Sequence, residues 1–161
     1  PTPYGVSIPK TLQTIHHRVE SSMIFTCNFA NWEKIPVPVL PISIARFPPK
    51  GFKCQSYEPF FPPLELLEAY KSGACSDALY TDTYNLLVLN KLNPSQVVDD
   101  LYNMAEAQGL HAVVLLCYES SNRFCHRHLA RKWLEKTRIT AMEFEIKPVL
   151  KTSLGLRKKH D

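Results

Sequence analysis

Thiol, imidazole and carboxylate side chains are concentrated in one short stretch of the chain. Cys117 and Glu119 follow an uninterrupted apolar run, and Cys125, His126 and Arg127 come shortly afterwards. A carboxylate can act as a nucleophile, or as an acid or base in glycosidic chemistry. A thiol at the start of a helix, beside an imidazole and a guanidinium, has a lowered pKa and is more reactive. These residue types predict that Glu119, Cys125 and His126 are catalytic.

Anion-binding groups follow the other predicted strands. Arg46 comes after a second strand-like run, and together with Arg127 it could hold a phosphate group by charge-assisted hydrogen bonds. Amide groups at the start of the following helix would add to this site. In an open parallel sheet the carboxyl ends of the strands share one edge, where ligands bind. The predicted ligand-binding residues are Asn28, Asn31, Ser43, Arg46, Cys117 and Arg127.

Structural roles are the alternatives for the same side chains. Glu119 could pair with Arg127 or His126 and thereby clamp a strand to a helix, since ion pairs of this kind also occur for purely structural reasons. Cys125 could be a small buried residue one turn before Leu129. From the residues alone, both alternatives remain open.

Two other kinds of chemistry fit the spacing less well. Cys117 and Arg123 have the separation found in cysteine phosphatases, but no glycine lies between them and Glu119 would repel a phosphate. Potential zinc ligands are Cys117, Cys125, His126 and His128. On one helix, however, positions 126 and 128 point about 200° apart. We therefore assign no residue to a metal.

The elements expected to position these residues alternate between strands and helices. Apolar runs rich in β-forming residues predict strands, and helical spacing after a proline or a cap predicts helices. Strands are expected at Met23–Cys27, Val39–Phe47, Ala112–Cys117 and Met142–Ile146, and helices at 64–72, Asp82–Leu92, 95–108 and from Ser120, Ser121 or Asn122 to about Leu134. This alternation indicates an α/β fold, a parallel sheet with helices on both faces.

Composition limits the class of protein. The 161 residues, 45% hydrophobic and 21% charged, are enough for a single domain with a core, and the longest apolar run is too short to cross a bilayer, so no membrane partner is expected. Five cysteines, an odd number, disfavour a disulfide scaffold and favour a cytoplasmic protein. Five isolated glycines exclude a P-loop and a dinucleotide-binding loop.

The formal net charge of +4 is unevenly distributed. Four basic residues against Asp161 place +3 of it within residues 151–161. We expect an irregular N-terminal arm at 1–20, an α/β domain at 21–148 and a basic tail at 149–161. Arg157, Lys158 and Lys159 in that tail would allow weak contact with nucleic acid. The nearly neutral remainder favours a small anionic ligand over a duplex.

Four short motifs resemble a known family, the bacterial and phage family called domain of unknown function 488. They are L-L-C-Y-E at 115–119, F-C-H-R-H-L-A at 124–130, and the weaker N-F-A-N-W at 28–32 and S-I-A-R-F-P-P at 43–49. The resemblance covers roughly residues 22–135 and implies a Rossmann-like α/β fold, without a settled reaction. Related members often have Asp-Val-Arg where this chain has Ile44-Ala45-Arg46, so the arginine is kept and the carboxylate is not.

Together these features predict a protein that binds or processes a nucleotide, a nucleoside or another phosphorylated ligand at the carboxyl end of its sheet. One alternative is a non-catalytic binding or inhibitor module of phage type. A further alternative is a metal-dependent or cysteine-dependent hydrolase.

Overall fold

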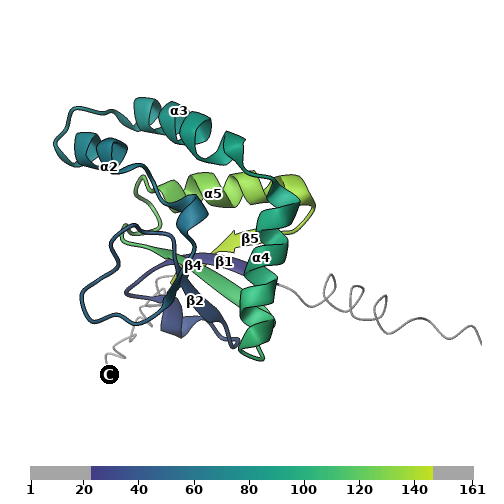
Figure 1. Ribbon diagram of the computed structural model, residues 1–161. Helices are drawn as coiled ribbons and strands as arrows, with labels where there is room; N and C mark the ends of the chain where they lie inside the picture. Colours follow the sequence, from purple (N-terminus) through teal and green to yellow (C-terminus); the bar gives the residue numbers. More distant parts are fainter. Residues whose placement is uncertain (1–22, 147–161) are drawn as a thin grey trace, which may run out of the picture.

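A computed structural model describes residues 23–146 of the chain (Figure 1). The predicted arm at 1–20, the tail at 149–161 and the cations Arg157, Lys158 and Lys159 lie outside the described residues. Within 23–146, no helix is both long and apolar enough to cross a membrane.

The centre of the molecule is a five-stranded parallel sheet with strand order β3-β2-β4-β1-β5. Its strands are β1 (Met23–Asn28), β2 (Leu40–Ser43), β3 (Gln55–Ser56), β4 (Ala112–Cys117) and β5 (Ala141–Glu143). The central strand β4 is buried along its whole length, as its unbroken apolar sequence predicts. Asn28 pairs in register with Cys117, and Ser43 pairs with Leu116. Three strands therefore end together at one edge of the sheet.

The α-helices are α2 (Leu64–Lys71), α3 (Asp77–Leu87), α4 (Pro94–Ala107) and α5 (His126–Leu134). Helices α4 and α5 contact the sheet directly, and α3 and α2 pack farther out, beyond α5 (Figure 1). Gly73, with φ of +80°, follows the end of α2 as the sequence predicts. The predicted α/β fold with a parallel, Rossmann-like sheet is confirmed.

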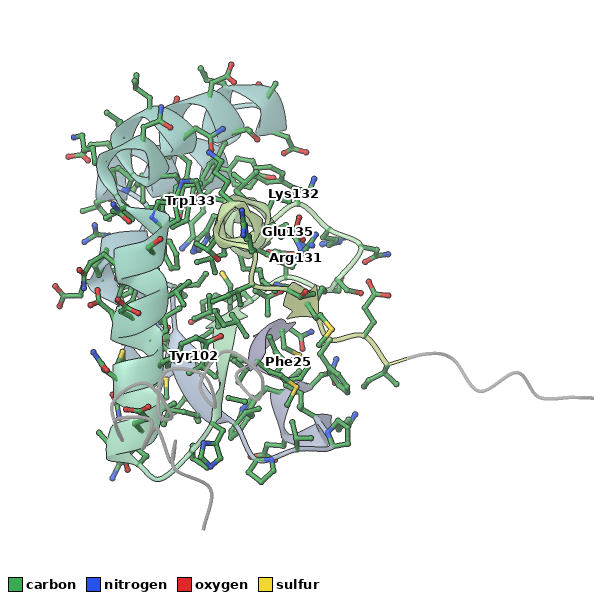
Figure 2. The ribbon with its side chains drawn as sticks, turned by 90° about the vertical axis from the view of Figure 1, so that its right-hand side faces the viewer. Phe25, Tyr102, Arg131, Lys132, Trp133 and Glu135 are labelled. Atoms are coloured by element: carbon green, nitrogen blue, oxygen red, sulfur yellow. The ribbon has the colours of Figure 1, made fainter. Side chains whose placement is uncertain are left out.

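The two faces of the sheet are covered differently. Within 23–146, the α-helices pack on the face that carries Ile24, Val113 and Leu115. The opposite face carries Phe25, Cys27, Val114 and Leu116 and is covered by the short 3-10 helix η1 (Trp32–Lys34) with neighbouring loop residues. Figure 2 shows this arrangement, with Trp133 of α5 and Phe25 of β1 on opposite sides of the sheet.

Helix starts depart most from the sequence prediction. Helix α3 begins at Asp77 instead of Asp82, because the Ser76 hydroxyl accepts a hydrogen bond from the Leu79 amide. Asn93, not Ser95, caps α4. The prediction that α5 is capped within 120–122 is wrong, since the Ser120 hydroxyl donates to the Asn122 side chain in a surface loop and the helix starts at His126.

Candidate functional site

The loop between β4 and α5 brings two cysteines and a histidine together. Cys117 ends β4, Cys125 immediately precedes α5, and His126 is the first residue of that helix. The two sulfur atoms and one imidazole nitrogen all lie within 4.8 Å of one another, and all three residues are buried. These three residues, here called the Cys–His cluster, therefore lie together at the carboxyl end of β4.

The hydrogen bonding of His126 determines which nitrogen faces the sulfur atoms. Its Nε2 lies 2.7 Å from the carbonyl oxygen of Ile44, which can only accept, so Nε2 carries the proton. In the neutral ring Nδ1 is then an acceptor, and it lies 3.7 Å from Cys117 Sγ, whose thiol can donate to it. The Tyr84 ring packs against the imidazole with ring centroids 5.5 Å apart. The cluster thus contains an oriented nitrogen lone pair beside thiols.

The two thiols of the cluster are electrostatically different. Hydrogen bonding with Cys117 lowers the pKa of Cys125 well below its ordinary value, and His126 and Arg127 lower it further although burial opposes them. The same hydrogen bond, together with burial, raises the pKa of Cys117. Of the two thiols, Cys125, at the positive end of α5, is therefore the one that ionises more readily.

A cavity of about 370 Å³ opens beside the Cys–His cluster, within the size range of small-molecule sites. All three cluster residues line it. The charged residues in its wall are Arg46, Lys71 and Glu119, and the aromatic ones are Phe47, Tyr70, Tyr80 and Tyr118. Lys71 and the three tyrosines were not among the predicted site residues, since they lie on α2, α3 and a loop that only the fold brings to this edge.

Arg46 is held in place at the cavity. Its Nε donates to the carbonyl oxygen of Pro62 at 3.0 Å, and its guanidinium carbon lies 5.8 Å from the centre of the Phe61 ring. The Nε bond occupies one donor of five, so the fork keeps donors for an anion. The sequence prediction that Arg46 lies at the ligand edge agrees with this placement.

Arg127 points elsewhere, although it is next to His126 in sequence. It is fully buried and makes a bidentate contact with Glu143 of β5, with Nη2 to Oε1 at 2.7 Å and Nε to Oε2 at 3.2 Å. Thr26 also donates to Glu143, and His128 Nδ1 lies 3.8 Å from it. Sequence reasoning missed Glu143, which lies within the strand predicted at Met142–Ile146.

Of the remaining predicted residues, Glu119 lines the cavity, and Asn28, Asn31 and Ser43 do not. Glu119 lines it but makes only a long contact of 3.9 Å with Arg123, so the predicted clamp to Arg127 or His126 does not form. Asn28 Oδ1 lies 3.8 Å from Cys27 Sγ, and Asn31 Oδ1 accepts from Lys34 at 3.4 Å. Ser43 is buried and donates to the Ala45 carbonyl at 3.0 Å. These three polar residues organise the strand ends and do not line the cavity.

A comparison with protein families places the chain. Residues 24–138 match a family model described as the active DUF488-N3 subclade, DUF488 being the domain of unknown function 488. The chain belongs to the DUF488 family. No curated protein and no solved structure matches it. The matched DUF488 segment contains the sheet from β1 to β4, the Cys–His cluster and α5, so the resemblance in the four motifs is confirmed.

Proposed function

We propose that this DUF488 domain binds a small anionic ligand with an aromatic ring, such as a nucleotide or nucleoside phosphate, and transforms it chemically. The observation that carries the proposal is that Arg46 and the Cys–His cluster line the same cavity. An anion-binding group and a reactive group in one pocket of suitable size are the usual components of an enzyme site.

The charges in the cavity wall favour an anion. Arg46 and Lys71 outnumber Glu119, and Glu119 is half-exposed beside Arg123. The start of α5 also lies here, and the dipole of a helix of nine residues is positive at that end. A phosphate near Arg46 would gain charge-assisted hydrogen bonds without displacing the Pro62 contact.

The aromatic residues account for the ring. Tyr70, Tyr80 and Tyr118 line the cavity together with Phe47. Several of these side chains are themselves held by ring contacts or hydrogen bonds: Tyr70 packs on Tyr80 at 5.2 Å, and the Tyr118 hydroxyl donates to the Phe47 carbonyl. Aromatic side chains stack on any base. The cavity wall therefore predicts that the ligand carries an aromatic ring, without predicting which base it is.

The reactive part of the site is the Cys–His cluster, with Glu119 as the acid or base at the rim. The imidazole has a defined proton position and two adjacent sulfur atoms, a combination of groups suited to proton transfer and nucleophilic attack. The cluster is also largely buried, which strengthens its electrostatic interactions with a bound ligand.

The test is a calorimetric titration with nucleoside monophosphates and diphosphates, followed by mass spectrometry of the ligand after incubation. Arg46→Ala should weaken binding by about tenfold or more, the value of a lost charge-assisted hydrogen bond. Arg123→Ala removes an exposed guanidinium outside the cavity and should leave affinity unchanged. Cys125→Ser should bind ligand and return it unaltered.

Two results would contradict the proposal. If no nucleotide binds, or if Arg46→Ala and Arg123→Ala behave alike, the cavity is not an anion site. If the wild-type protein binds a nucleotide but returns it unchanged, the transformation fails and the domain is a non-catalytic binding module.

A further inference from the structure

We infer that the Cys–His cluster is a metal site, in which Cys117, Cys125 and His126 bind one divalent ion of the zinc type through two sulfur atoms and Nδ1. The inference deepens the proposed function, because the ion would lie at the wall of the same cavity. Sequence reasoning disfavoured a metal because His126 and His128 cannot face one ion together, and the structure shows that His126 meets the cysteines without His128.

The distances fit tetrahedral coordination. With Zn–S near 2.3 Å and Zn–N near 2.05 Å, ligand atoms of a tetrahedral site are separated by about 3.6–3.8 Å. Cys117 Sγ and His126 Nδ1 lie 3.7 Å apart, and all three ligand atoms are within 4.8 Å of one another. Small rotations of the side chains are enough to close the site on an ion.

The surroundings of His126 are those of a metal ligand. Ligating histidines almost always donate their second ring nitrogen to a carbonyl or carboxylate, which fixes the tautomer. Nε2 of His126 makes this bond with the Ile44 carbonyl at 2.7 Å, and Nδ1 therefore presents its lone pair to the cysteines.

The donor set and charge select the type of ion. Two thiolates and an imidazole are soft or borderline ligands, which favour zinc over magnesium and calcium. A divalent ion would neutralise two thiolates in a buried position where they would otherwise repel each other. Three protein ligands leave a fourth coordination position, as in catalytic zinc sites. Because all three ligands line the cavity, a water or a ligand atom in the cavity could fill that position.

The first measurement uses the full chain, reduced, loaded with Zn²⁺ and freed of excess metal. Elemental analysis should give one zinc per chain for the wild type and for Cys54→Ser, a matched cysteine outside the cluster. Cys117→Ser and Cys125→Ser should lose it. If a correctly folded cluster variant keeps the same zinc content as Cys54→Ser, the inference is overturned.

The second measurement needs no substitution and so does not depend on whether a variant folds. Co²⁺ added to the reduced wild type should give the intense visible bands of tetrahedral coordination and near-ultraviolet bands of thiolate-to-cobalt charge transfer. A weak octahedral spectrum without charge transfer would overturn the inference, as would a Cys117–Cys125 disulfide that excludes cobalt under reducing conditions. Nucleotide binding that depends on Arg46, without any bound metal, would support the proposed function and overturn the metal site. Metal binding without nucleotide affinity would support the metal site and overturn the proposed function.

Discussion

Neighbouring residues at the start of α5 have opposite roles. His126 turns toward the cavity and lies among thiols, whereas Arg127 turns toward β5 and forms an ion pair with Glu143. Both side chains are buried, and both are residue types common in active sites. The difference is the partner: Glu143 supplies a counter-charge to the guanidinium, while His126 bonds the neutral Ile44 carbonyl and the Cys117 thiol. Burial of a titratable group therefore indicates a site only when the group also lines a cavity, as His126 does.

The largest expected effect comes from breaking the ion pair between Arg127 and Glu143. Glu143→Gln leaves the fully buried Arg127 without a counter-charge, and removal of one partner of a buried ion pair costs about 3–5 kcal/mol. Urea denaturation followed by circular dichroism measures this loss. Glu135→Gln is the control, because its pair with Arg131 is a more exposed (i, i+4) contact at 3.1 Å worth less than about 1 kcal/mol. Equal losses for both variants would mean that Arg127 finds another partner.

A second prediction concerns Cys27, whose thiol lies near the ion pair of Arg127 and Glu143. Burial and the charge of Glu143 raise the pKa of Cys27 to about 11 from 9.0. At neutral pH this gives about a hundredfold less thiolate than an ordinary cysteine, and only the thiolate reacts. Alkylation of Cys27 by iodoacetamide, followed by peptide mass spectrometry, should be slow and should still accelerate between pH 9 and 10 in folded protein. A rate that levels off near pH 8 would contradict this environment.

The smallest expected effect on stability is that of substituting Glu119, which lines the cavity. Glu119→Gln should change the free energy of unfolding by less than about 0.5 kcal/mol, because its contact with Arg123 is long and both side chains are exposed. The same substitution should nevertheless reduce turnover of a bound ligand if Glu119 is the acid or base. A stability loss comparable to that of Glu143→Gln would make Glu119 a structural clamp.

Sequence reasoning identified the central strand and the residues around it, because local pattern carries that information. The apolar run at 112–117 could only be a buried strand, and the prolines and Gly73 marked the two ends of α2. The start of α5 was placed too early because Ser120 and Asn122 are good caps in isolation. Their side chains bond to each other instead, so residues 120–122 belong to the loop that brings Cys125 to Cys117.

The sequence by itself determined the fold class, the family and the position of the thiols, the imidazole and Arg46 at one edge of a parallel sheet. The fold class and the edge follow from periodicity and from the rule that parallel strands end together, and the family follows from the four motifs. Only the tertiary structure decided which partner each polar group meets. Glu143 is distant from Arg127 in sequence, and Ile44 is distant from His126, so neither pairing leaves a local signal. Long-range contacts gave Arg127 an internal ion pair and placed the adjacent His126 in the cavity wall.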